Sequence, residues 1–324
     1  YCDVKYGVGV NSGTDALFLG LKALGIGAGD EVITVANTAV PTVSAIASTG
    51  ATPRFVDIDT GTYLMDTSQL EGAITKKTKC ILPVHLYGQC VNMNEIKLTA
   101  VNHGLSIIED CAQSHGASFK GKKAGSMSDI AAFSFYPTKV LGGYGDGGMM
   151  ITDNESLNKK LRRLRFYGME QTYYSEEHGY NSRLDELHAE ILLRKLTRLD
   201  EYIKRRREIA LRYDQLLADK GLALPKTAPG NEHVYYLYVC RHPGRDEIIS
   251  RLQAKDIFLN ISYKWPIHIM PAYEFLGYRV GDLPHTEKAA NEIFSLPMYP
   301  ALSDEEQGIV ITELCDVLAG IEEK

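Results

Sequence analysis

The chain has 324 residues, 44% of them hydrophobic and 23% charged, which is typical of a globular protein with a sizeable buried core. This length fits one large domain plus a smaller one. The formal net charge of −6 lacks the basic excess of a general nucleic-acid binder, so no nucleic-acid partner is expected. No apolar run approaches the roughly 18 residues that span a bilayer, and no signal peptide opens the chain, so no membrane partner is expected.

Six cysteines are scattered along the chain without a Cys-x-x-Cys pair. This pattern is typical of reduced thiols, so we expect a cytoplasmic protein with neither a disulfide framework nor a bound metal. The basic runs Arg162–Arg163 and Arg205–Arg207 fall in helical stretches and are interpreted as solvated faces. The first residue is Tyr1 and not Met, which suggests that the chain lacks its natural start.

From about residue 8 to 152, short β-rich runs alternate with helical ones. Helices are predicted at Asp15–Leu24, closed by Gly25, and at Met93–His103, closed by Gly104. Alternation of this kind predicts an α/β fold with a doubly wound, mostly parallel sheet. The predicted strands are Val32–Val35, Phe55–Ile58, Cys80–Val84, Leu105–Ile108, Ile130–Phe135 and Met149–Thr152.

The second half of the chain predicts a smaller C-terminal α+β domain. We assign residues 1–205 to the large domain and 206–324 to the small one, with the boundary inside or just after a long helix. The elements expected here are that long helix at Asp185–Leu217, a strand at Val234–Cys240, a helix at Asp246–Ala254 and a closing helix from Asp304.

In open α/β sheets, ligands bind at the carboxyl ends of the strands. Asp110 follows the predicted strand Leu105–Ile108. An acid that leaves a buried apolar strand is costly unless it meets a cation or several donors. A protonated pyridine nitrogen would be such a partner, whereas the plainer interpretation is an ordinary helix N-cap.

Lys139 follows the strand Ile130–Phe135 and precedes the glycine-rich segment Gly142–Gly148. A lysine confined there has little room to solvate an ammonium, which favours the neutral amine that a Schiff base requires. A single lysine is more often a surface residue, but Asp110 at another strand end favours the catalytic interpretation. We interpret the glycines as allowing a tight turn after Lys139, not as a nucleotide loop.

Ser12, Gly13 and Thr14 open the helix Asp15–Leu24. Free N–H groups and the dipole at a helix start suit an anion such as a phosphate. Ser134 supplies another hydroxyl near Lys139. The spacing matches neither the GxGxxG fingerprint nor a P-loop, and a simple helix cap remains the alternative.

Five segments together resemble the DegT/DnrJ group of nucleotide-sugar aminotransferases, in order and over nearly the whole chain. The resemblance implies the aspartate-aminotransferase fold, which is PLP (pyridoxal phosphate) fold type I. The segments are Gly-Val-Asn-Ser-Gly-Thr-Asp-Ala-Leu, Pro-Val-His-Leu-Tyr-Gly-Gln, Ile-Glu-Asp-Cys-Ala-Gln-Ser-His-Gly, Phe-Ser-Phe-Tyr-Pro-Thr-Lys and Gly-Tyr-Asn-Ser-Arg-Leu-Asp-Glu.

The resemblance implies pyridoxal 5′-phosphate as the cofactor. Lys139 would hold it as a Schiff base and then carry the proton between cofactor and substrate carbons. Asp110 would pair with the pyridine nitrogen, and Gln113 would lie near the ring hydroxyl. The residues that would hold the phosphate are Gly13, Thr14 and Ser134.

The resemblance also implies a homodimer with shared active sites, because Asn181 would reach the phosphate of the neighbouring subunit's cofactor. Three departures from the group stand out. We expect that a segment usually found before this part of the chain is missing, Ala39 stands where many members place an aromatic ring over the cofactor, and His188 stands where glutamine is frequent.

The substrates implied are L-glutamate and a nucleotide-linked keto sugar. The segments Asn260–Met270 and Asn37–Thr42 look most like members that aminate C3 of dTDP-3-keto-6-deoxyhexoses. Amination at C4 and a non-catalytic sensor remain alternatives, as do a sugar dehydratase, which Lys139 disfavours, and an inactive fragment. The residues expected to shape the sugar pocket, with packing between the domains as the alternative, are Tyr263, Trp265 and His268.

Overall fold

The central sheet of the computed structural model, which describes residues 1–322, has the strand order β1-β9-β8-β5-β4-β2-β3. Strand β9 runs antiparallel to both of its neighbours, and the other pairs are parallel. The strands are β1 Tyr6–Val10, β2 Glu31–Val35, β3 Thr52–Val56, β4 Thr78–Ile81, β5 Ser106–Asp110, β8 Ile130–Ser134 and β9 Gly148–Thr152.

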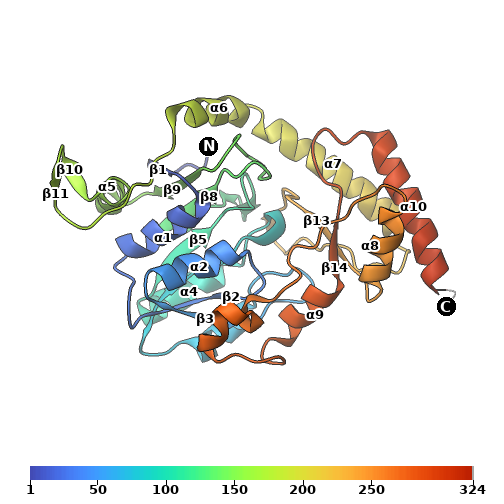
Figure 1. Ribbon diagram of the computed structural model, residues 1–324, viewed down its shortest axis with the longest axis horizontal. Helices are drawn as coiled ribbons and strands as arrows, with labels where there is room; N and C mark the ends of the chain where they lie inside the picture. The colour runs from blue at the N-terminus through green and yellow to red at the C-terminus, as the bar shows by residue number, and fades with distance from the viewer. Residues whose placement is uncertain (323–324) are drawn as a thin grey trace.

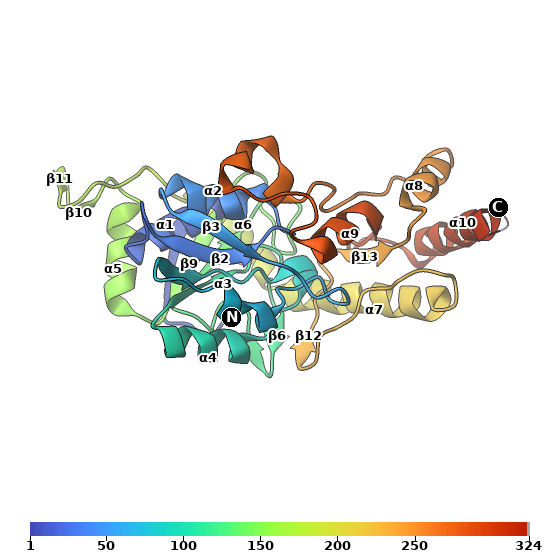
Figure 2. The ribbon, with the colours of Figure 1, turned by 90° about the horizontal axis from the view of Figure 1, so that it is seen from below.

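Helices cover both faces of this sheet, as Figure 2 shows with α2 on one side and α4 on the other. The predicted doubly wound, mostly parallel sheet is therefore confirmed. Burial on both faces explains the nearly continuous apolar character of strands such as β8, whose residues are all buried. The helices of this body are α1 Gly13–Ala23, α2 Val40–Ser48, α3 Leu70–Ala73, α4 Met93–His103 and α5 Glu155–Leu164.

The prediction of one long helix at Asp185–Leu217 is wrong in one respect, because the structure has two helices there. Helix α6 spans Glu186–Leu196 and helix α7 spans Leu199–Leu217. At the break, the Thr197 hydroxyl donates to the Arg194 carbonyl at 2.7 Å. Such a side-chain bond competes with the helical pattern, and no Gly or Pro marks the position in the sequence.

Helix α7 leads from the large body to a smaller lobe, seen at the right of Figure 1. The lobe has a hydrophobic core of its own, which includes Tyr213, Phe294 and Leu314. The predicted boundary near residue 205 remains a prediction. The elements of the lobe are β13 Tyr238–Arg241, α8 Arg245–Gln253, β14 Ile293–Leu296 and α10 Asp304–Glu322, whereas α9 Pro284–Glu292 packs its Ala289 into the core of the large body.

A short hairpin projects from the far end of the large body, away from the lobe (Figures 1 and 2). Its strands are β10 Met169–Gln171 and β11 Tyr174–Ser175. A separate small sheet joins β12 Asn231–Glu232 to β6 Ser118–Phe119 and β7 Lys122–Lys123. Within the described residues, no helix combines the length and apolarity needed to cross a bilayer.

Candidate active site

A cavity of about 310 Å³ lies at the carboxyl ends of β5 and β8, beside the start of α1. This is where ligands bind in open α/β sheets. Six of the seven residues predicted from the sequence to bind the cofactor line this one cavity: Gly13, Thr14, Asp110, Gln113, Ser134 and Lys139. A second cavity, of about 340 Å³, is almost wholly apolar and offers no comparable set of reactive groups.

Asp110 is the last residue of β5, and its carboxylate is buried in the cavity wall. Its Oδ2 accepts from the Thr42 hydroxyl at 2.8 Å, and its Oδ1 accepts from the Ala112 N–H at 3.1 Å. Burial raises the pKa of Asp110 above its ordinary value despite these bonds and the charge of Lys139. A buried cation would therefore be a favourable partner for this carboxylate. The hydrogen bond from Thr42, which lies on helix α2, could not be predicted from the sequence.

Lys139 lies in the turn that follows β8, where its backbone N–H donates to the Tyr136 carbonyl at 2.9 Å. Its Nζ is 4.9 Å from the centroid of the Tyr236 ring. The amine and the Asp110 carboxylate line the same cavity, yet within the described chain they form no ion pair with each other. Both groups thus remain available to a ligand between them.

The start of helix α1 forms the other end of the cavity. The Ser12 hydroxyl accepts from the Asp15 N–H at 3.1 Å, and the Ser12 carbonyl accepts from Ala16. The N–H groups of Gly13 and Thr14 precede these bonds and have no helical acceptor, as at any helix start. An anion such as a phosphate would satisfy them, with the Ser134 hydroxyl close by.

Gln113 is held at the cavity edge by two hydrogen bonds. Its Oε1 accepts from the Tyr87 N–H at 2.8 Å, and its Nε2 donates to the Tyr263 hydroxyl at 2.7 Å. The Tyr87 hydroxyl in turn donates to the carbonyl of Ser262. Gln113 therefore links the cavity to the segment that carries Tyr263.

The residues fit pyridoxal phosphate: an acid for a ring nitrogen, an amine for an aldehyde, and a helix start for a phosphate. Ala39 also lines the cavity, at the position where many members of the group place an aromatic ring. Ala39 offers no ring to cover the cofactor, so the departure noted in the sequence stands.

Asn181 is the one predicted cofactor residue outside this cavity. Its side chain is exposed, and it forms an isolated bridge with Phe166 near the projecting hairpin. This placement leaves Asn181 free to meet another molecule.

None of the three predicted sugar-pocket residues is part of the cavity wall described above. Tyr263 contacts the site through Gln113, and Trp265 is 64% exposed. The His268 side chain is fully buried, with its Nε2 3.0 Å from Oε1 of Glu287. That geometry favours, for His268, the alternative of packing between the domains.

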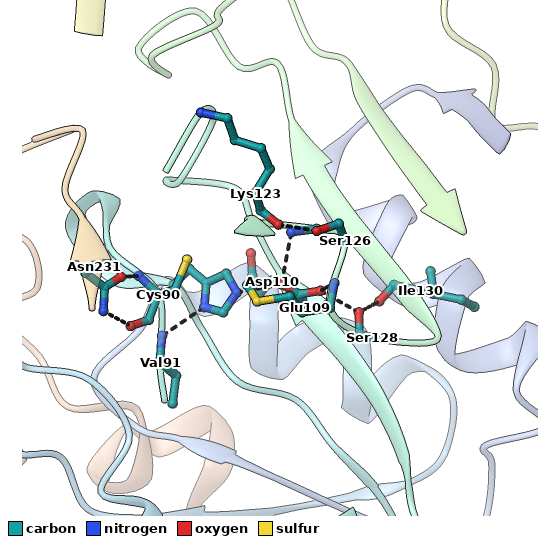
Figure 3. Close-up of polar contacts among 12 residues, drawn as sticks. Cys90, Val91, Glu109, Asp110, Lys123, Ser126, Ser128, Ile130 and Asn231 are labelled. Carbon is teal, nitrogen blue, oxygen red and sulfur yellow. Dashed lines mark hydrogen bonds and ion pairs between the residues drawn. The ribbon is translucent and has the colours of Figure 1, made fainter. Parts of the chain in front are cut away.

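His85, Glu109 and Cys111 form a buried cluster of potential metal ligands. Glu109 precedes Asp110 on β5 (Figure 3), so the two side chains point to opposite faces of the strand. The ligand atoms of the cluster lie within 4.8 Å of one another. The imidazole is already engaged at both nitrogens, since Nδ1 accepts from the Val91 N–H at 3.2 Å and Nε2 faces Glu109 at 2.9 Å.

The Glu109 carboxylate is equally occupied. It accepts from the N–H groups of Gly125 and Met127 and from the Ser128 hydroxyl, all at 2.8–2.9 Å. Burial raises the pKa of Glu109, but these donors and His85 outweigh it, and the net shift is downward. Because the lone pairs of the Glu109 carboxylate are already used, we interpret the cluster as structural. It fixes the position of β5 and therefore of Asp110.

Comparison with known proteins agrees with this geometry. The model of the DegT/DnrJ/EryC1/StrS aminotransferase family matches residues 1–315. This chain belongs to that family.

Two curated relatives illustrate the range of names in the family. A dTDP-3-amino-3,4,6-trideoxy-alpha-D-glucose transaminase of Micromonospora megalomicea subsp. nigra is 55% identical, over 99% of this chain and 87% of the relative. A protein of Geobacillus stearothermophilus named pleiotropic regulatory protein is 45% identical, over 98% of this chain and 86% of the relative.

Solved structures show the same fold. DesV of S. venezuelae, solved in complex with a ketimine intermediate, has a TM-score of 0.96 and 43% identity, covering 98% of this chain and 86% of that one. NtdA of Bacillus subtilis, with bound cofactor PMP, has a TM-score of 0.92 and 34% identity, covering 98% and 74%. The predicted aminotransferase fold is confirmed.

Proposed function

We propose that this aminotransferase moves an amino group from L-glutamate to C3 of a nucleotide-linked keto sugar, most closely a dTDP-3-keto-6-deoxyhexose, with pyridoxal 5′-phosphate as cofactor. The observation that carries the proposal is the meeting of Lys139, Asp110 and the Gly13–Thr14 helix start in one cavity. The 55% identity to a dTDP-sugar transaminase supports the substrate class.

When bound, the cofactor supplies an electron sink that lets an amino group and a carbon-bound proton be exchanged. Lys139 would hold the cofactor through Nζ and later carry the proton to or from the substrate carbon. Asp110 would keep the ring nitrogen protonated. The N–H groups of Gly13 and Thr14, with the hydroxyl of Ser134, would bind the phosphate.

The proposal also includes a homodimer in which each active site uses residues of both subunits. Asn181 is exposed outside its own cavity, and the neighbouring hairpin exposes Tyr173 (94%) and Tyr174 (65%). Exposed aromatic side chains of this kind are typical of surfaces that bind a partner. A second subunit would cover them and receive Asn181 at its phosphate. The six cysteines are unpaired, which supports the expected cytoplasmic location.

The function is tested by incubating the protein with L-glutamate and either a dTDP-3-keto or a dTDP-4-keto-6-deoxyhexose. Mass spectrometry and NMR of the product would identify the carbon that carries the new amino group. We expect amination at C3. Amination at C4 alone, or no product with either sugar, would contradict the proposal.

The substitution Lys139→Ala tests the proposed role of Lys139 in holding the cofactor and carrying the proton. We expect turnover to be lost, because a positioned base alone contributes about 10²–10⁴-fold and the covalent hold on the cofactor disappears as well. The visible absorbance of the bound cofactor should change with it. Substantial transamination by this variant would remove Lys139 from its assigned role.

A further inference from the structure

The Tyr236 ring lies beside the Lys139 amine, with Nζ 4.9 Å from the ring centroid. An ammonium within about 6 Å of an aromatic centroid is attracted by the negative ring face. Within the described chain, the Lys139 amine has no carboxylate ion pair that would compete with this contact. We infer that Tyr236 is a positioning residue, whose ring receives the Lys139 ammonium whenever this amine is not bonded to the cofactor.

Contacts with Arg206 and His233 fix the segment that carries Tyr236. The guanidinium of Arg206, a buried residue of helix α7, donates to the carbonyls of Tyr235 and Tyr236 at 3.0 and 3.2 Å. Tyr235 has φ +48°, a conformation that costs a non-glycine residue energy, and its ring stacks on His233 at 4.1 Å. These constraints hold the Tyr236 backbone in place beside Lys139.

The same segment is also tied to the large domain. The Val234 N–H donates to the Gly88 carbonyl at 2.9 Å, and Gly88 has no room for a side chain, since a Cβ would meet the Tyr236 nitrogen at 2.9 Å. The Tyr236 hydroxyl is 3.3 Å from the Thr138 hydroxyl, next to Lys139. Tyr236 is therefore anchored from both domains.

Several other groups surround the amine. Asp110 faces it from the end of β5, and Asp146 faces the same cavity from the glycine-rich loop. His115 carries no charge there, because burial lowers its pKa to about 3. Tyr136 lines the cavity. The Tyr263 phenol lies near enough to Asp110 to interact with its charge. With its centroid 4.9 Å from Nζ, the Tyr236 ring lies close enough to stabilise the ammonium without binding it covalently.

This inference rests on the proposed role of Lys139. The test uses the full chain freed of cofactor and measures how fast its amine combines with added pyridoxal phosphate, by visible absorbance, across a range of pH. The reaction joins neutral Nζ to the aldehyde carbon and releases one water. A ring that stabilises the ammonium lowers the neutral fraction, so its loss should speed the reaction on the acidic side.

Tyr236→Leu keeps apolar cover but removes the ring, and we expect a rate about 2–5-fold higher on the acidic side, with the midpoint of the profile at lower pH. Tyr236→Phe should keep the original profile, because the ring remains. Phenylalanines with increasing fluorine content at position 236 keep the size of the ring and weaken its negative face, so the rate should rise stepwise with fluorine number.

The matched control is Tyr202→Leu on helix α7. It removes a ring whose centroid lies 5.3 Å from the guanidinium carbon of Arg198. It should leave the profile unchanged. A flat fluorine series, or an equal shift in Tyr202→Leu, would overturn the role of Tyr236. If Lys139→Ala still bonded the cofactor, the assignment of Lys139 would fail instead, so the two failures are distinguishable.

Discussion

The Asp110 carboxylate keeps acceptor capacity after its two internal hydrogen bonds, to Thr42 and Ala112. A carboxylate has about four lone-pair sites, so one oxygen can still face a ring nitrogen. Its burial means that this pairing would be made in a medium of low dielectric, where it is strong. We therefore propose that the role of Asp110 is electrostatic and that its charge matters more than its shape.

Asp110→Asn separates these two properties, because the amide has the same size but no charge. We expect the variant to bind the cofactor and to react about 10²–10³-fold more slowly, the usual cost of losing one preorganised electrostatic group. Single-turnover rates with glutamate, together with cofactor stoichiometry, would measure this. A normal rate would show that Asp110 only caps the following turn.

Glu109 makes a different contribution, to the stability of β5. Its folded pKa lies below the ordinary 4.5, so its stabilising effect is complete above the unfolded value and is lost as the pH falls through the folded one. In Glu109→Gln, the amide NH₂ would face two of the four donors. We expect a loss of about 2–4 kcal/mol at neutral pH.

Urea unfolding of wild type and Glu109→Gln at several pH values would test this. The difference between them should shrink below pH 4.5. A constant difference down to the acid limit would mean that the carboxylate charge contributes nothing to folding.

At the scale of elements, the start of α1 and the end of β8 approach so closely that only glycine fits between them. A Cβ on Gly13 would lie 2.6 Å from the Ser134 Cβ and 3.1 Å from its Cα. Gly13→Ala must therefore move the helix start away from Ser134. We expect about 10–100-fold weaker binding of pyridoxal phosphate, equivalent to 1–3 kcal/mol of overpacking.

Gly72→Ala in α3 is the matched control, since a Cβ there meets nothing within 4 Å. Equilibrium titration of each variant with the cofactor would give the comparison. Equal affinities in the two variants would show that the α1 start is not part of the phosphate site.

Asp110 and Lys139 could be predicted to line one cavity because both follow apolar strands, and strand ends of a parallel sheet meet at one edge. The contacts that Tyr236 and Thr42 make at the site could not be predicted, because Tyr236 follows no strand of the central sheet and Thr42 reaches Asp110 from helix α2 only through packing. Their positions depend on tertiary packing, for which the chain carries no local pattern.

The elements show the same division. Helix Met93–His103 was predicted at its observed bounds because Gly104, with φ +62°, ends it. Strand β1 (Tyr6–Val10) was missed, because its two glycines weaken the β signal and it pairs only with β9.

At the scale of the whole molecule, Lys139 and Asn181 lie in different surroundings. Lys139 lines the cavity, whereas Asn181 is exposed outside it. If each site takes Lys139 from one subunit and Asn181 from the other, two inactive variants can complement each other. A dimer that uses only its own residues cannot do so.

The test mixes Lys139→Ala with Asn181→Ala subunits after gentle dissociation. Each hybrid dimer would contain one site with both residues intact, so a random equal mixture should regain about a quarter of wild-type activity. The control mixes Lys139→Ala with Asp110→Asn, whose changes fall in opposite sites of the hybrid and leave none intact. We expect activity to return only in the first mixture, because only there do both substitutions of a hybrid dimer fall in the same site, which leaves the other site intact. Equal activity in both mixtures would show that Asn181 serves its own subunit.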